Sequence, residues 1–401
     1  MKSAFCTALA IGSLAALGCP SRPTFDRDVA PILSRSCVRC HHAGGTAPVP
    51  LLETGAQAVA AAAKIRLAVQ LREMPPWGAD NTGLCRTWKD ALWLGNGEVE
   101  KLVKWTEAPD PGHSTAALHP PAEPRFGPAA AAIDQGTAWK PGLGPEAYRC
   151  FVADPHLASD ALVAAFRVVS TDPRSVEQVT LYALDTPEAE AAAEALDRAD
   201  EGPGYSCYGS SRVAGARLAT SWTWDSDVLR LPDGFGIRLA AGRKVVLQVH
   251  YNVIASGLES PTRTRVELEL APGAREASFV EVAAAGTTLA PHRKLVEATA
   301  QAPLERDLTV LGIAPRMHSL GQTMQVDVVH GAERTCAANF DHWNFYAQRL
   351  FLYEKPLEVR RGDSVRVGCV YTTQGRPSPV QMGERIDEEE CRASLLVAAP
   401  R

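Results

Sequence analysis

The hydrophobic pattern of the chain changes across residues 108–146, a stretch rich in proline, alanine and glycine. Apolar residues before this stretch recur at helical spacing, whereas those after it alternate with polar residues, as strands do. Because one segment cannot satisfy both periods, the change predicts separate domains joined by a linker over 108–146. A chain of 401 residues has room for two or three domains.

The part before the linker predicts three helices. Thr24–Ser36 is amphipathic, and Gly55–Glu73 is rich in Ala, Leu and Val. Asn96 suits the N-cap of a helix over Gly97–Glu107, whose apolar residues share one face. Together these segments predict a small helical domain over residues 19–107.

From about Ala147 the chain consists of short alternating runs between Gly, Pro and Asp turns, which is typical of antiparallel β-sandwiches. Since one sandwich uses about 100 residues, we expect two, over 147–272 and 273–401, with a seam near Pro272-Gly273. Glu188–Ala199 is expected to be a helical insertion. The runs behind this prediction are Val176–Leu184, Val245–Asn252, Arg265–Leu270, Met324–Val329, Arg349–Tyr353 and Ser364–Tyr371.

The helical part contains Cys37-Val38-Arg39-Cys40-His41. Two cysteines three positions apart, followed directly by histidine, are the attachment signature of c-type haem. A structural zinc site would need four ligands, commonly two such cysteine pairs, and the next cysteine is the isolated Cys85. A thioredoxin-like pair would need a surrounding βαβ pattern. The motif therefore favours haem c, with Cys37 and Cys40 as thioether positions and His41 as an iron ligand.

Met74 is the candidate for the second iron ligand. It lies in Met74-Pro75-Pro76-Trp77, shortly after a predicted helix. A methionine thioether paired with histidine is a common ligation in electron-transfer haem proteins. Core packing is the alternative role of Met74. As an iron ligand beside the Cys37–His41 motif, Met74 predicts a cytochrome c-like domain.

The N-terminus predicts export. Lys2 precedes an apolar run from Ala4 to Leu17, which is too short to span a membrane and is typical of a signal peptide over residues 1–18. Ala16-Leu17-Gly18-Cys19 resembles a bacterial lipobox, so Cys19 is either a lipidation site or an incidental cysteine beside an ordinary cleavage site. We therefore expect a periplasmic or cell-surface protein with disulfides, possible lipid anchoring through Cys19, and, at net charge −5, no nucleic-acid partner.

Residues 146–396 contain blocks that resemble the copper type II, ascorbate-dependent monooxygenases. The blocks are Val246–Asn252, Ile313–Gly321, Trp343–Gln348 and Gly383–Cys391. The resemblance implies two antiparallel, jelly-roll-like β-sandwich domains, each with one copper in the family. It also implies the disulfides Cys150–Cys207 and Cys369–Cys391, and it leaves open whether Cys85 and Cys336 pair or stay free.

The family's copper ligands are mostly replaced in this chain. A His-His pair corresponds to Glu177-Gln178, and the later histidine of the same site is His250. In the second site, His-x-His becomes Arg316 and His318, and the methionine becomes Glu390. Copper that cycles between two oxidation states needs soft and imidazole donors, so His250 and His318 are remnant positions where copper is doubtful.

We hypothesise that Arg316 and Glu390 form an ion pair in place of the metal, with His318 nearby. Copper on His250 with Glu177 and Gln178 is a weaker alternative to a histidine that is hydrogen-bonded within its sheet. The run Glu388–Glu390 is otherwise expected to be a solvated turn.

Two functions follow from these patterns. The first is an exported haem protein for electron transfer or redox sensing, with β domains that have lost catalytic copper and no assigned catalytic residue. The alternative is an active copper-dependent monooxygenase that the haem domain supplies with electrons. Either function needs a redox partner protein or a small-molecule reductant.

Overall fold

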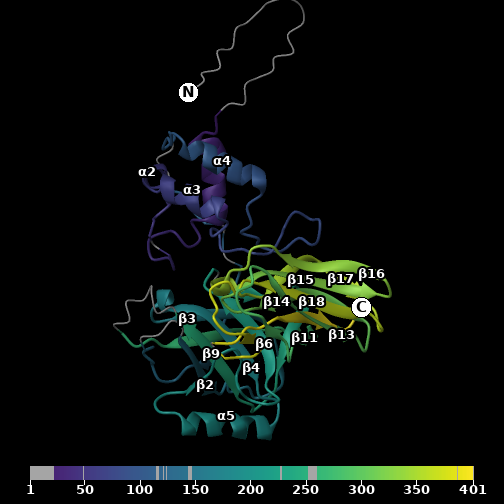
Figure 1. The fold of residues 1–401 in the computed structure, drawn as a ribbon. Helices are drawn as coiled ribbons and strands as arrows, with labels where there is room; N and C mark the ends of the chain where they lie inside the picture. Colours follow the sequence, from purple (N-terminus) through teal and green to yellow (C-terminus); the bar gives the residue numbers. More distant parts are fainter. Residues whose placement is uncertain are drawn as a thin grey trace, which may run out of the picture.

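The computed structural model describes residues 22–400 except for 48, 114–116, 121, 123, 143–146, 226–227, 252–259 and 386. It consists of a helical part and a larger β part (Figure 1). The proposed signal peptide and Cys19 lie outside the described residues. Within the described residues, no helix combines the length and apolar character needed to cross a membrane.

The helices form where the sequence predicts them. They pack around a core that includes Phe25, Leu33, Leu102 and Trp105. The predicted helix over Gly55–Glu73 is broken at Ala61, and it ends before Arg72, whose φ of 58° is left-handed. The helical elements are η1 (Phe25–Val29, a π-helix), α1 (Ala30–Ser36), α2 (Gly55–Ala60), α3 (Ala62–Gln70) and α4 (Asn96–Thr106).

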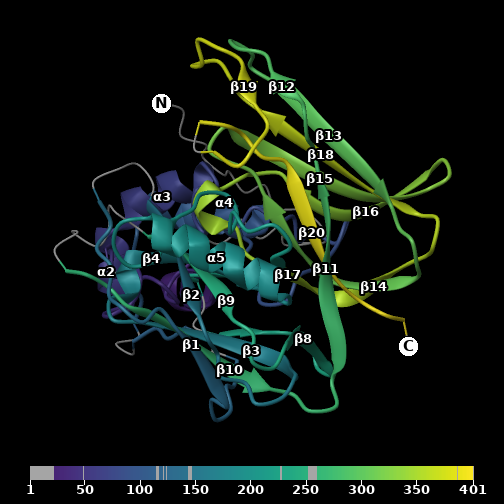
Figure 2. The same cartoon turned by 90° about the horizontal axis from the view of Figure 1, so that it is seen from below.

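A sheet of nine strands runs through both halves of the β part (Figure 2). Its pairs are antiparallel except for β8 with β11, which is parallel and follows the predicted seam directly. The strand β1 lies inside the segment predicted to be a linker, so residues 131–134 of that segment are an edge strand. In sheet order the strands are β1 (Ala131–Asp134), β10 (Thr264–Leu270), β3 (Ala161–Ser170), β8 (Phe235–Leu239), β11 (Arg275–Ala283), β20 (Arg392–Ala398), β14 (Leu308–Arg316) and β17 (Phe351–Val359), and β7 (Val228–Arg230) pairs with β3.

Three further sheets complete the β part, and two large apolar cores fill it. The helix α5 (Pro187–Ala199), predicted as an insertion, begins at the N-cap Thr186 and packs Ala189 and Ala193 on the five-stranded sheet. The five-stranded sheet is β5 (Tyr205–Ser206), β2 (Ala147–Ala153), β9 (Val245–Tyr251), β4 (Val176–Ala183) and β6 (Arg217–Thr223). The others are β13 (Val296–Pro303), β18 (Ser364–Tyr371), β15 (Gly321–His330) and β16 (Glu333–Phe340), and the pair β12 (Thr288–Leu289) and β19 (Val380–Gln381); short 3-10 turns are η2 (Pro173–Ser175) and η3 (Phe345–Ala347).

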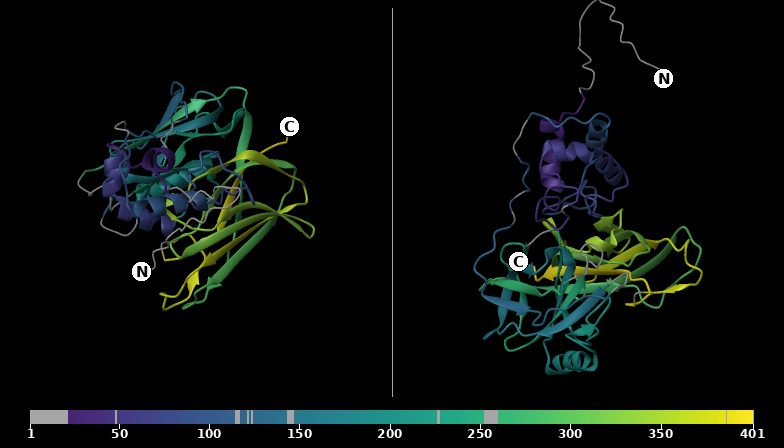
Figure 3. Two further views of the ribbon diagram at one scale, coloured as in Figure 1. Left: turned by 90° about the horizontal axis from the view of Figure 1, so that it is seen from above. Right: turned by 90° about the vertical axis from the view of Figure 1, so that its left-hand side faces the viewer.

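The loop between α3 and α4 fastens the helical part to the β part (Figure 3). Trp77 packs edge-on against Phe351, with ring centroids 4.9 Å apart, and Trp88 stacks obliquely on Tyr353 at 4.9 Å. Backbone hydrogen bonds join Asp80 to Asn339 and Lys89 to Leu352. The disulfide Cys85–Cys336 closes this junction across 251 residues of sequence. The pairing that the sequence left open is therefore a cross-link between the two parts.

Candidate functional site

The Cys37–His41 motif begins at the C-terminal end of α1. Cys37 is the C-cap of that helix, and the backbone N–H of His41 donates to the carbonyl of Cys37 at 3.0 Å. The three disulfides of the structure join six other cysteines. Burial raises the pKa of the Cys37 thiol to about 12, and the neighbouring Cys40 adds to the shift. Cys37 is therefore a neutral thiol at physiological pH.

His41 is oriented by a backbone carbonyl. Its Nδ1 lies 3.0 Å from the carbonyl oxygen of Pro50, and because a carbonyl only accepts, Nδ1 must donate. Donation at Nδ1 selects the tautomer whose Nε2 carries the lone pair, which is how metal-binding histidines are held in proteins. Burial lowers the pKa of His41 although nearby carbonyls oppose the shift, so the neutral imidazole that a metal requires is favoured.

Apolar side chains are exposed in the same helical part. Among the described residues, eight large hydrophobic side chains are exposed, and Val49, Leu67, Leu71 and Met74 account for half of them. Leu67 on α3 and Leu71, the C-cap residue of that helix, lie four positions apart, hence on one face. These four side chains are therefore accessible to a ligand or partner of the helical part.

Met74 lies where the helical and β parts meet. It lines a cavity of about 210 Å³ together with Trp77, Trp93 and His342. Its side chain is 37% exposed, so it is not a core residue, and simple core packing does not describe it.

The first of the two copper-like positions lies on neighbouring strands of the five-stranded sheet. Gln178 on β4 is paired in register with His250 on β9. His250 is buried, stacks on Tyr148 with ring centroids 4.0 Å apart, and places Nε2 3.5 Å from Glu177 Oε2. Gln178 Nε2 donates to Ser221 Oγ and to the carbonyl of Gln348. These contacts fit a histidine and an amide held within the sheet better than a cation site.

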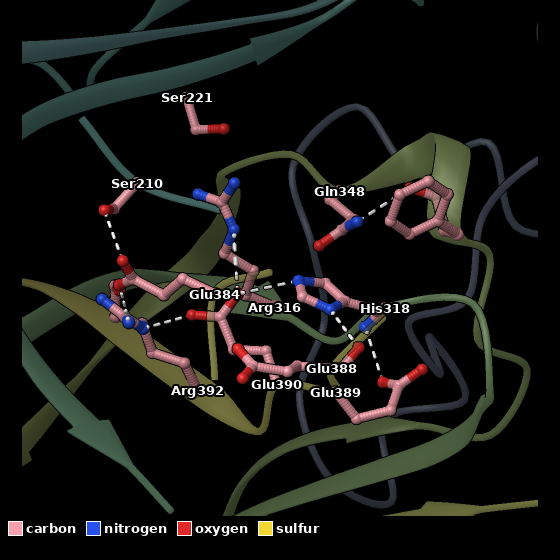
Figure 4. A network of polar contacts seen from close by, with 12 residues as sticks. Ser210, Ser221, Arg316, His318, Gln348, Glu384, Glu388, Glu389, Glu390 and Arg392 are labelled. Carbon is pink, nitrogen blue, oxygen red and sulfur yellow. Dashed lines mark hydrogen bonds and ion pairs between the residues drawn. The ribbon is translucent and has the colours of Figure 1, made fainter. Parts of the chain in front are cut away.

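The second position is occupied by a buried cluster of charges (Figure 4). Glu390, only 5% exposed, places Oε2 3.2 Å from Arg316 Nε and 3.6 Å from His318 Nε2. Its Oε1 lies 2.6 Å from Arg392 Nε. Arg316 at the end of β14 and Arg392 at the start of β20 are register partners in the nine-stranded sheet, which brings both guanidinium groups to one carboxylate.

The charged groups of this cluster stabilise one another in their ionised forms. Burial alone would raise the pKa of Glu390, but the His318 contact and the charges of Arg316 and Arg392 lower it to about 2. Burial likewise opposes the charged form of His318, but the Glu390 carboxylate raises the pKa of that imidazole. A bound cation would have to displace a guanidinium group from its carboxylate.

The glutamate run beside this cluster differs from its prediction as a solvated turn. Glu389 is 1% exposed and accepts hydrogen bonds from the backbone N–H groups of His318 and Leu320. The carbonyl of Glu388 lies 2.8 Å from His318 Nδ1. The turn is folded against the His318 loop, and all three of its residues contact His318.

Aromatic rings fill the space between the two copper-like positions. His250 stacks on Tyr148, Tyr148 contacts Tyr208 at 4.9 Å, and Tyr208 contacts His318 at 5.1 Å. Phe345 contacts both histidines, at 5.9 Å and 6.4 Å between ring centroids. No cluster of three or more His, Cys, Asp or Glu suited to a metal ion is present in the part of the chain that the structure describes.

Several residues of the charged cluster were not singled out from the sequence. Arg392 is bound on its outer side by Glu384, at 2.8 Å, and by Glu281, at 3.4 Å. The disulfides Cys150–Cys207 and Cys369–Cys391, which the resemblance implied, are both formed. Since Cys391 lies between Glu390 and Arg392, the second disulfide anchors the cluster.

The fold is that of a β protein with an attached helical part, and comparisons with known proteins show what its β part is similar to. Residues 282–396 match the family model described as copper type II ascorbate-dependent monooxygenase, C-terminal domain. The chain is 23% identical over 188 residues to peptidylglycine alpha-amidating monooxygenase of Rattus norvegicus, covering 45% of this chain and 19% of that protein. It is 24% identical over 201 residues to peptidyl-glycine alpha-amidating monooxygenase A of Xenopus laevis, covering 48% and 21%.

The chain thus matches about a fifth of the length of these relatives. Among solved structures, PNGF-II is similar with a TM-score of 0.28 and 9% identity, covering 67% of this chain and 66% of that one. A likeness at this level carries no argument about function. The β part of the chain is therefore similar to the copper monooxygenases, most clearly in its C-terminal half.

Proposed function

We propose that the protein is an exported c-type haem protein that transfers electrons or senses redox state, with monooxygenase-like β domains that serve as a scaffold. The observation that carries the proposal is the contact between His41 Nδ1 and the carbonyl of Pro50, within a Cys-x-x-Cys-His motif whose cysteines belong to none of the disulfides. It presents the histidine in the tautomer that an iron ligand needs.

The residues present fit haem c. Cys37 and Cys40 would carry the thioether bonds, and His41 and Met74 would bind the iron. The bound haem would provide reversible one-electron chemistry. The exposed apolar side chains of Val49, Leu67 and Leu71 would be covered by a large apolar group.

The β domains would not hold catalytic copper in this proposal. The Arg316–Glu390 ion pair and the Arg392 contact occupy the second position, and a guanidinium charge repels a metal cation. At the first position, one imidazole with a carboxylate and an amide is a poor donor set for copper. We assign this ion pair a structural role, because a buried charge that loses its partner strongly destabilises a fold.

An active copper-dependent monooxygenase is the second candidate function. It is favoured by the family match over residues 282–396 and by the similarity to the amidating monooxygenases. In that case copper would bind at His250 or His318, and the haem domain would deliver electrons. The ligand replacements weigh against this candidate because a site, and not a fold, carries an activity.

The proposal also includes the location of the protein and its partners. The N-terminal apolar run and the disulfides support export to the periplasm or cell surface, with Cys19 as an optional lipid anchor. The partner would be a redox protein or a small-molecule reductant. The net charge of −5 gives no reason to expect binding to nucleic acid.

The test is the absorbance spectrum of the full chain produced with cytochrome c maturation. We expect a c-type spectrum with the signature of methionine ligation, and loss of that signature in Met74→Ala with the haem retained. Met317→Ala, which removes a buried methionine of the β part, is the matched control and should leave the signature unchanged. A chain without covalent haem would overturn the proposal.

A further inference from the structure

The strand β4 is buried on both faces, and one of its faces is polar. Val179, Leu181 and Ala183 alternate into the apolar core. Gln178 and Thr180 point the opposite way, into a cavity of about 200 Å³. Buried polar groups without hydrogen-bond partners cost free energy, so a polar ligand in this cavity would be stabilised by the side chains of the strand.

Hydrogen-bond donors gather at one end of this cavity. Thr180 is 1% exposed, and its Oγ1 has no partner in the structure. Ser221 Oγ accepts from Gln178 Nε2 at 2.9 Å, so the Ser221 hydroxyl proton remains for donation. Both residues come from the five-stranded sheet, on strands β4 and β6.

Arg316 enters the same end from the nine-stranded sheet. Its Nε faces Glu390, and its terminal nitrogens lie on the opposite side, toward Ser221 (Figure 4). A guanidinium group has five N–H donors, and its recorded partners are the Glu390 carboxylate and the Tyr182 side chain. Donors therefore remain on the side of the cavity.

The charges of the cavity are divided between its ends. Near Arg316 the neighbouring carboxylate is Glu390, which it shares with Arg392 and His318. Glu281 and Glu384 also line the cavity, at the end of Arg392. Their oxygens are bound by Arg392, by Ser210 and by Ser394. An anion is repelled from that end and attracted to the Arg316 end.

We propose that this cavity is a binding site for a small monocarboxylate. The planar carboxylate would lie against the terminal nitrogens of Arg316, in the paired geometry that guanidinium groups favour. The hydroxyls of Thr180 and Ser221 would donate to it. Val213, Ala216 and Leu218 also line the cavity, so a short aliphatic tail has apolar neighbours. The site does not depend on haem or copper.

The test is calorimetric titration of the full chain with formate, acetate, propionate and sulfate. We expect binding of at least one carboxylate that Thr180→Val weakens by roughly three- to tenfold, the effect of one lost neutral hydrogen bond. Thr220→Val is the matched control, since Thr220 Oγ1 is also buried without a partner but does not line the cavity, and it should leave the affinity unchanged.

The double variant Arg316→Gln/Glu390→Gln removes the guanidinium group while keeping the net charge of the cluster. We expect it to lose at least tenfold in carboxylate affinity, since a charge-assisted bond is lost. The proposal is overturned if the unmodified chain binds no carboxylate, if it binds only sulfate, or if Thr220→Val weakens binding as much as Thr180→Val.

Discussion

The Cys37–His41 motif and the Arg316–Glu390 cluster each hold a histidine, but their surroundings have opposite effects on the binding of a metal ion. In the first, the ring of His41 is held by the Pro50 carbonyl so that its other nitrogen can bind a metal. In the second, His318 is held just as firmly, by Glu388 and Glu390, but two guanidinium groups share the carboxylate beside it. Orientation of a histidine is therefore not enough to predict a metal site. The charge of its neighbours decides whether a cation can enter.

The largest expected effect comes from removing the two thiols of the Cys37–His41 motif. The double variant Cys37→Ala/Cys40→Ala should lose covalent haem completely, because no other cysteine pair among the described residues adjoins an oriented histidine. Haem staining after denaturing electrophoresis measures the loss. The double variant Cys85→Ser/Cys336→Ser removes the same number of cysteines and should keep the haem. Equal loss in both variants would argue against the motif as the attachment site.

Removing one charge from the cluster should have the next largest effect. Arg316→Ala leaves Glu390 buried with less compensation, and breaking such a pair costs about 3–5 kcal/mol of unfolding free energy. Chemical denaturation measures this cost. Arg316→Met/Glu390→Leu removes both partners and should cost clearly less. If Arg316→Ala were as stable as the unmodified chain, the ion pair would not maintain the structure.

The junction between the two parts predicts a smaller effect. Cys85→Ser/Cys336→Ser opens a loop of 251 residues and should cost about 2–4 kcal/mol, since long loops gain most from closure. Hydrogen exchange should rise at Asp80 and Lys89, whose backbone bonds join the parts. Unchanged exchange there would show that Trp77 and Trp88 hold the junction without the disulfide.

An ion pair with one exposed partner, His330, gives the baseline for the buried cluster. Asp363 accepts from the Arg360 backbone and lies 2.6 Å from His330, and these contacts lower its pKa although burial opposes them. The folded-state pKa is below the unfolded one, so the stabilisation is present above about pH 4 and is lost as pH falls through the folded value.

Asp363→Asn should therefore cost about 1 kcal/mol at neutral pH, and less as the pH falls below about 4. Denaturation curves at several pH values test this. His330→Ala, which removes the exposed partner alone, should cost less. A cost that did not change with pH would exclude the carboxylate charge as its source.

The bounds of helices and strands were predicted well from the sequence where the periodicity of apolar residues sets them. The strands β4, β9 and β18 and the helix α5 begin and end within two residues of their predictions, because alternation and an N-cap are local signals. The register that brings Arg392 to Arg316 is set by long-range pairing. No local pattern in the sequence predicts this register.

The same limit applies to burial and pairing. Three consecutive glutamates suggest a solvated turn, yet Glu389 is buried because the His318 loop folds onto it. The bond between Cys85 and Cys336 stayed open because cysteine connectivity is not readable from spacing alone. The predicted positions Arg316, His318 and Glu390 are all members of the cluster. Arg392 and its partners Glu384 and Glu281 were not singled out from the sequence.

The most direct test of the account is the haem and copper content of one preparation of the full chain, made with cytochrome c maturation and with copper supplied. Absorbance gives the haem, and elemental analysis gives the copper after dialysis. The account predicts about one covalent haem per chain and copper well below one per chain. Two tightly held coppers per chain, or no covalent haem, would contradict it.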